Sequence, residues 1–76
     1  MDFDSFLANF AGLFEDTPAE EITADTEFKY LDEWSSMSAL TLVAMVEDEY
    51  DVTLTGEDIR NTDTVSELFE LINKNK

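Results

Sequence analysis

Apolar side chains recur at intervals of three and four residues near the start of the chain. The positions are Phe3, Phe6, Leu7, Phe10, Leu13 and Phe14. This spacing places them on one face of an α-helix, so the pattern predicts a helix from about Asp4 to Glu15. Asp2 and Asp4 suit its start, where acidic side chains cap free N–H groups. Thr17 and Pro18 should end it, because the residue before a proline avoids helical backbone angles.

The stretch from Asp16 to Trp34 shows no such period and contains Pro18 among several Thr and Asp residues. We expect a long loop that Phe28 and Leu31 hold to the core. Loops of this length within a compact domain often have a function. A passive connection between two helices fits the same pattern.

A second helical pattern runs from about Ser36 to Tyr50 and has two different faces. At about 100° per residue, one face carries residues typical of a core: Ala39, Leu42, Val43, Val46 and Tyr50. The opposite face carries Met37, Leu40, Thr41, Ala44 and Asp48, with Glu47 beside them. Exposed Met and Leu ringed by acidic residues are typical of a surface that docks with a partner protein. The alternative is that the loop or a later short helix covers them.

Two further helices are predicted after a short connection. Thr55, followed three residues later by Asp58, is typical of a capped helix start, and it would open a single turn through Arg60. A final helix begins near Thr64, with Asp63 or Thr64 as its cap. Its buried stripe consists of Val65, Leu68, Phe69 and Ile72. Its C-terminal end is basic, with Lys74 and Lys76.

Residues 1–76 are therefore expected to form one domain, an all-α four-helix bundle with three main helices and one short helix. The composition lacks cysteine and histidine. No thiol is available as a nucleophile or metal ligand, and the commonest general base near neutral pH is missing. The sequence also has no Gly-rich phosphate loop, nucleophile–base pair or metal-ligand spacing. We expect neither an enzyme nor a metal site.

The charge of the chain is strongly unbalanced, with 19 acidic residues against 4 basic ones and a formal net charge of -15. A surface of this sign repels phosphate backbones and anionic lipid headgroups, which argues against nucleic acid and membranes as partners. It would steer association with basic protein surfaces, although the same acidity could serve only to keep a small domain soluble.

The sequence contains no targeting or membrane signal. The start, Met1-Asp2-Phe3-Asp4, lacks the basic region of a signal peptide. No apolar run approaches the roughly 18–20 residues that cross a bilayer. The expected location is the cytoplasm.

The best candidate for chemistry is the run Leu31-Asp32-Glu33-Trp34-Ser35-Ser36-Met37, which leads into the second helix. A serine at this boundary is a preferred helix N-cap. The position also suits a phosphoryl group, because free backbone N–H groups and the positive end of the helix dipole meet a phosphate there. A long flexible arm attached at such an exposed site could leave the surface.

The chain resembles acyl carrier proteins over its whole length. The matching features are the long loop after the first helix, the aromatic Phe28, the pair Ser36-Met37, the run Leu42 to Asp51 with its acidic-acidic-aromatic-Asp end, and Thr64-Val65. The resemblance implies an acyl-carrier-like four-helix bundle with a covalent 4′-phosphopantetheine on Ser36. The thiol of this arm would hold acyl groups as thioesters.

One departure from the family concerns the attachment motif. The family usually has Asp-Ser-Leu, whereas this chain has Ser35-Ser36-Met37. Met in place of Leu is a mild change of similar volume. Ser in place of Asp removes a carboxylate beside the attachment site and makes Ser35 an alternative site. A chain that has lost the modification altogether is a second alternative.

The resemblance also implies a function and partners. The chain would be a monomeric carrier rather than an enzyme, modified by a phosphopantetheinyl transferase. It would shuttle acyl groups between enzymes of fatty acid, polyketide or related lipid synthesis whose basic patches dock on it. The partner-binding face would consist of Met37, Leu40, Thr41, Ala44, Glu47 and Asp48.

Two other functions remain open, an aminoacyl carrier (peptidyl or D-alanyl carrier) and an unmodified acidic helical adaptor.

For an acyl carrier, the core between the helices is expected to shelter the acyl chain. Its expected lining is Phe6, Phe10, Val43, Val46 and Leu68.

Overall fold

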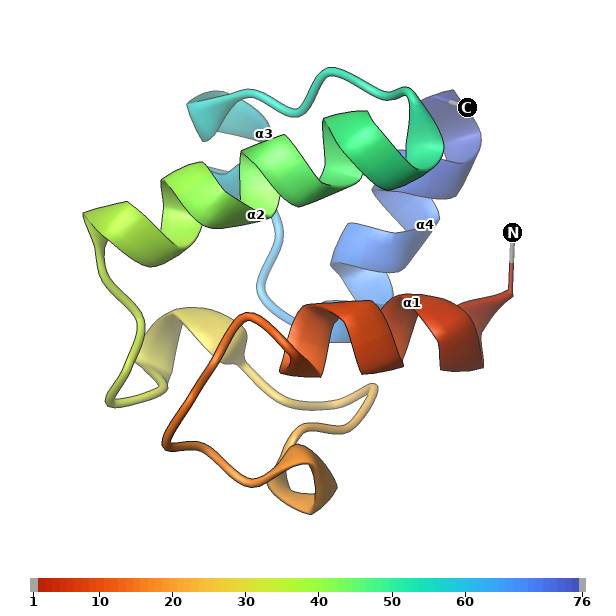
Figure 1. The fold of residues 1–76 in the computed structure, drawn as a ribbon. Helices are drawn as coiled ribbons and strands as arrows, with labels where there is room; N and C mark the ends of the chain where they lie inside the picture. Colours follow the sequence, from red (N-terminus) through yellow and green to blue (C-terminus); the bar gives the residue numbers. More distant parts are fainter. Residues whose placement is uncertain (1, 76) are drawn as a thin grey trace.

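The computed structural model describes residues 2–75, which form four α-helices and two short 3-10 helices (Figure 1). The α-helices are α1 (Phe3–Ala11), α2 (Ser36–Tyr50), α3 (Gly56–Arg60) and α4 (Val65–Asn75). The 3-10 helices η1 (Ala19–Glu21) and η2 (Phe28–Tyr30) lie in the long loop between α1 and α2. No strand occurs among the described residues, so the predicted all-α bundle of three main helices and one short helix is confirmed.

The first helix is shorter than predicted, since α1 ends at Ala11 rather than near Glu15. Beyond Ala11 the backbone tightens into i→i+3 bonds, from Leu13 N–H to the Phe10 carbonyl at 3.1 Å and from Phe14 N–H to the Ala11 carbonyl at 3.2 Å. This turn still directs Phe14 into the core, where its side chain is buried. The apolar period therefore continues past the end of the helix, which explains the wrong boundary.

The helix starts follow the predicted caps. The Asp2 carboxylate accepts a hydrogen bond at the start of α1. At α3, Thr55 Oγ1 accepts from the Asp58 N–H at 3.1 Å, and the Asp58 carboxylate accepts from the Thr55 N–H at 3.0 Å. Thr64 and Glu67 exchange the same pair of bonds at the start of α4, at 3.2 and 3.3 Å. These bonds satisfy N–H groups that have no partner within their helix.

A cluster of aromatic side chains forms the centre of the core. Phe6, Phe10 and Phe28 are fully buried. The ring of Phe10 lies edge-on to that of Phe28, with centres 5.6 Å apart, and Trp34 packs edge-on against Phe28 at 5.2 Å. Such pairs contribute about 0.5–1.5 kcal/mol each beyond the burial of their area. The prediction that Phe28 pins the long loop to the core is confirmed, and Leu31 packs against the same core.

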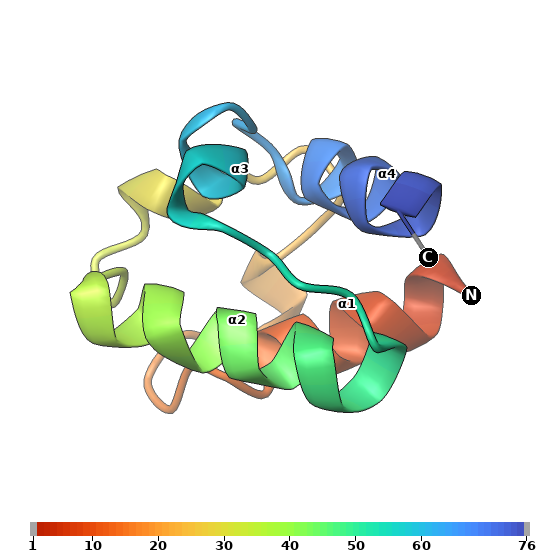
Figure 2. The ribbon, with the colours of Figure 1, turned by 90° about the horizontal axis from the view of Figure 1, so that it is seen from above.

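The helices α2 and α4 both pack against α1 (Figures 1 and 2). At the C-terminal end of α2, the Tyr50 hydroxyl accepts a hydrogen bond from the Asn9 side-chain amide at 2.9 Å. On α4, the ring of Phe69 lies 5.1 Å from that of Phe3 and 5.6 Å from that of Phe6. The short helix α3 lies beside the N-terminal half of α2 (Figure 2). This placement leaves the start of α2 at one end of the bundle.

Two backbone hydrogen bonds tie the long loop to the start of α4. The Val65 N–H donates to the Thr26 carbonyl at 3.1 Å, and the Ser66 N–H donates to the Ala24 carbonyl at 2.9 Å. The loop thereby supplies acceptors for N–H groups that the first turn of a helix leaves unpaired. It is an ordered part of the fold that connects α1, α2 and α4.

The left-handed backbone at the end of α2 allows a test of local strain. Asp51 has φ 57°, and its N–H closes the helix on the Glu47 carbonyl at 3.1 Å. Glycine adopts this conformation without the steric cost of a Cβ. We expect Asp51→Gly to raise the free energy of unfolding by about 0.5–1 kcal/mol in urea denaturation. Asp51→Asn removes the same charge but keeps the Cβ, so an equal gain in this control would assign the effect to charge and contradict the prediction.

Candidate functional site

The two adjacent serines at the start of α2 differ in their hydrogen bonds. Ser35 is the N-cap: its Oγ accepts from the Ser38 N–H at 3.3 Å and lies 3.4 Å from the Ser38 Oγ. Ser36 is the first residue of the helix and is exposed. Its hydroxyl makes no hydrogen bond to any of residues 2–75. Ser36 therefore differs from Ser35 in having a hydroxyl that is free of hydrogen bonds within residues 2–75, and its role as the attachment site stays a prediction.

The Ser35 cap also explains why the departure from the family's Asp is compatible with the fold. Ser and Asp are nearly equivalent as N-caps, because the side-chain oxygen of either residue accepts a bond from an N–H in the first turn. The capping function is kept, and the change removes only a negative charge beside Ser36.

The surroundings of Ser36 fit a phosphodiester. The first N–H groups of a helix have no partner within it, and the dipole of the 15-residue α2 places partial positive charge there. The first turn of α2 contains no acidic residue. A phosphodiester on the Ser36 Oγ would therefore meet donors and a favourable field, without direct repulsion from a neighbouring carboxylate in that turn.

Glu33 fixes the segment that leads into α2. Its carboxylate accepts hydrogen bonds from the Thr17 hydroxyl at 2.6 Å, the Asp16 N–H at 3.0 Å and the Glu15 N–H at 3.2 Å. The Glu33 carbonyl also accepts from the Ser38 hydroxyl at 2.9 Å. The bond from Thr17 is the largest cause that lowers the pKa of Glu33, and the backbone bonds lower it further, while partial burial acts in the opposite direction. Glu33 thus joins residues 15–17, which follow α1, to the start of α2.

The second face of α2 is exposed, as the pattern predicts. Met37 is 71% exposed and Leu40 is 66% exposed. Thr41, Ala44, Glu47 and Asp48 are exposed as well. On the opposite side Leu42, Val46 and Tyr50 are buried. The alternative that the loop or α3 covers this face is wrong. These six exposed residues, called the docking face below, keep their partner-binding role as a prediction.

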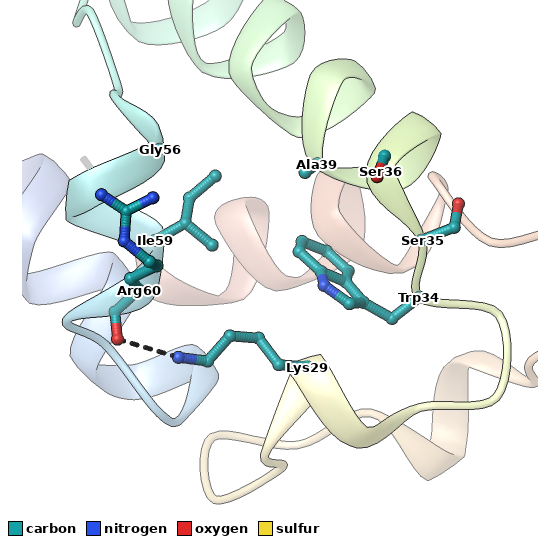
Figure 3. Close-up of a pocket in the computed structure, with 8 residues that line it drawn as sticks. All are labelled: Lys29, Trp34, Ser35, Ser36, Ala39, Gly56, Ile59 and Arg60. Carbon is teal, nitrogen blue, oxygen red and sulfur yellow. Dashed lines mark hydrogen bonds between the residues drawn. The ribbon is translucent and has the colours of Figure 1, made fainter.

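A cleft opens beside Ser36, between the start of α2 and α3 (Figure 3). Its volume is about 400 Å³, within the range of small-ligand sites, roughly 300–1,000 Å³. The lining residues are Lys29, Trp34, Ser35, Ser36, Ala39, Gly56, Ile59 and Arg60. None of the five residues expected to line an acyl-binding space is among them. Phe6, Phe10, Val46 and Leu68 instead have no exposed surface and fill the core.

Sequence reasoning missed four lining residues: Lys29, Gly56, Ile59 and Arg60. Gly56, Ile59 and Arg60 recur at a spacing of three and four on α3, which places them on one face of that helix. Lys29 comes from η2 and its side-chain ammonium donates to the Arg60 carbonyl at 3.1 Å. The only sequence feature that could have pointed to Lys29 and Arg60 is the scarcity of basic residues, because these two make up half of them.

One comparison with known proteins gave a match. A family model described as a phosphopantetheine attachment site matches residues 5–72 of the chain, which include both serines and the whole of α2. No curated protein and no solved structure gave a significant match. None of the helices within residues 2–75 has the length and apolarity needed to cross a bilayer.

The hydrogen bonds of Glu33 predict how its contribution to stability depends on pH. Because the pKa of folded Glu33 is lowered from its usual value near 4.5, its carboxylate stabilises the fold at and above that value. The contribution is lost as the pH falls through the lower folded pKa. We expect wild type to exceed Glu33→Gln in free energy of unfolding at neutral pH, with a difference that shrinks in acid. Urea denaturation across the pH range measures this difference.

Glu70→Gln is the matched control for this prediction, because Glu70 is an exposed residue of α4 whose side chain makes no hydrogen bond to any of residues 2–75. This variant removes the same charge as Glu33→Gln and keeps the hydrogen bonds of Glu33, so it measures the effect of net charge alone. A Glu33→Gln difference that does not change with pH would contradict the role of the carboxylate.

Proposed function

The chain belongs to the phosphopantetheine attachment family, and on this premise we propose that it is an acyl carrier protein whose arm is attached to Ser36. Its cofactor is a covalent 4′-phosphopantetheine, and its general function is that of a phosphopantetheine carrier. The observation that carries the choice of Ser36 is its exposed hydroxyl at the first position of α2, while the Ser35 hydroxyl is used as the cap.

The role of Ser36 is to anchor the arm. A separate, magnesium-dependent transferase would remove the proton from the Ser36 Oγ. The oxygen would bond to the pyrophosphate phosphorus that carries the pantetheine group of coenzyme A. Adenosine 3′,5′-bisphosphate would leave with the electrons of the broken P–O bond. When attached, the arm supplies a terminal thiol that forms thioesters, which the cysteine-free chain cannot supply itself. Ser35 caps the helix, and the N–H groups of α2 bind the phosphodiester.

The docking face supports the choice of partners. Carrier domains interact with modifying and acyl-handling enzymes. Met37 and Leu40 offer exposed apolar contacts at the side of the arm, and Glu47 and Asp48 offer charges that suit basic patches. Interfaces of this kind associate fast and remain brief, which suits a shuttle that visits several enzymes.

The proposed carrier acts as a monomer in the cytoplasm, where coenzyme A and the transferase are available. Its pathway is fatty acid, polyketide or related lipid synthesis, and it is a substrate of the pathway enzymes rather than a catalyst. An aminoacyl carrier would use the same Ser36 and the same arm, so loading assays with acyl and aminoacyl donors separate these two. An unmodified adaptor would use only the docking face.

Intact mass spectrometry tests the attachment site directly. Incubated with coenzyme A, magnesium and a broad-specificity transferase, the wild-type chain should gain the mass of one phosphopantetheinyl group. Ser36→Ala should gain nothing. Ser35→Asp should be modified like wild type, because Asp keeps the N-cap but has no hydroxyl to modify. If wild type and Ser35→Asp both stay unmodified, the carrier function is wrong. A gain by Ser36→Ala would show that the site is wrong.

The docking face generates a kinetic prediction. Reversing the charges of Glu47 and Asp48 to Lys should raise the KM of the transferase about tenfold at low salt, because exposed charges mainly set the rate of association. The effect should fall as salt is added. The control reverses Glu20 and Glu70 to Lys, two exposed residues outside the docking face, and so makes the same change in net charge. Equal effects of the two variants would show that net charge, rather than this face, sets the KM.

A further inference from the structure

The cleft beside Ser36 concentrates positive charge in a strongly acidic chain. Lys29 and Arg60 line it, although the chain has only 4 basic residues against 19 acidic ones. The Lys29 ammonium is partly engaged, since it donates to the Arg60 carbonyl and lies 3.8 Å from the Asp63 carboxylate. The Arg60 guanidinium makes no hydrogen bond and no ion pair with any of residues 2–75. Its five N–H donors are available to a ligand.

The rest of the cleft is apolar. Trp34 and Ile59 come from opposite walls, between Ser36 on α2 and Arg60 on α3 (Figure 3). Trp34 is held by Phe28 and Phe14, with ring centres 5.2 and 6.4 Å away, so this wall is fixed by the core. A ligand that fits both the walls and Arg60 must have an apolar stem and a negatively charged end.

We propose that the cleft binds an acyl group that carries a carboxylate at its far end, presented by the arm on Ser36. This inference rests on the proposed attachment at Ser36. The arm leaves the chain on the α2 side of the cleft and is flexible enough to fold back, so that the acyl stem lies between Trp34 and Ile59. The carboxylate then meets the Arg60 guanidinium, which can bind both of its oxygens.

The charge of the chain favours this assignment over a plain alkyl group. A net charge of -15 repels an anionic acyl group from most of the surface, so such a group needs a local cationic contact to remain bound. An alkyl chain has no charge and no hydrogen-bond acceptor that could contact the Arg60 guanidinium. The phosphodiester of the arm does not serve as the anion either, because it is fixed to the Ser36 oxygen, and Figure 3 places Arg60 across the cleft from Ser36.

Trp34 is the only tryptophan of the chain and reports on the cleft directly. The transferase loads the protein from coenzyme A, hexanoyl-coenzyme A or adipoyl-coenzyme A, where the last two differ by the terminal carboxylate. Acrylamide quenching of the Trp34 fluorescence measures how far each cargo covers the cleft. We expect the adipoyl form to enter the cleft with an equilibrium constant about two- to fivefold larger than the hexanoyl form. Added salt should reduce the difference.

Arg60→Gln should abolish the difference between the adipoyl and hexanoyl forms. Lys74→Gln, which removes an equal charge on α4 outside the cleft, should retain it. Circular dichroism checks that both variants keep the helical fold. These variants separate a local contact from a change in net charge.

Three results would overturn the inference. Equal quenching of the two loaded forms would make the cleft a purely apolar site. Loss of the difference in Lys74→Gln as well as Arg60→Gln would assign it to net charge. An Arg60-dependent protection of Trp34 in the form without cargo would identify the phosphodiester as the anion. Failure of the proposed function is distinct from all three, because the mass spectrum would then show no arm on Ser36.

Discussion

The contact of Phe28 with Phe10 on one side and Trp34 on the other is the interaction on which the rest of the structure depends. A chain of this size hides only about 60% of the surface that its unfolded form exposes, and a long irregular loop contributes few helical hydrogen bonds. The aromatic cluster compensates by fixing the middle and the end of the loop to α1. The loop end that carries Trp34 is also the entrance to α2, so the position of Ser36 follows from it.

Polar contacts then fix the orientation of the segment that leads into α2, which the aromatic contacts alone do not determine. The three hydrogen bonds to the Glu33 carboxylate fix the chain immediately before α2. The Ser35 cap begins the helix at the next residue and leaves the Ser36 hydroxyl outside the hydrogen-bond network. The proposed attachment site therefore divides two tasks between neighbouring serines. One stabilises the helix, and the other remains exposed for chemistry.

The sequence predicts α2 correctly from Ser36 to Tyr50, because a clear apolar period and a capping serine coincide there. The end of α1 is wrong because Leu13 and Phe14 keep the apolar spacing in a backbone that has already left the helix. The sequence already favours Ser36 over Ser35, and the hydrogen bonds at the start of α2 add that Ser35 is the helix cap. The cleft could not be predicted, because Lys29 and Arg60 are far apart in sequence and only the folded loop brings them to the same site.

The remaining question from the composition is whether the acidity does more than keep the domain soluble. If the acids were mainly structural, those of the docking face would be paired with the few cations. The one ion pair found among residues 2–75 instead joins Lys29 to Asp63, outside that face. Glu47 and Asp48 are exposed, and unpaired surface carboxylates keep their full attraction for a basic partner. Because Arg60 lies in the cleft rather than beside them, the chain can attract partners with one surface and hold an anionic group with another.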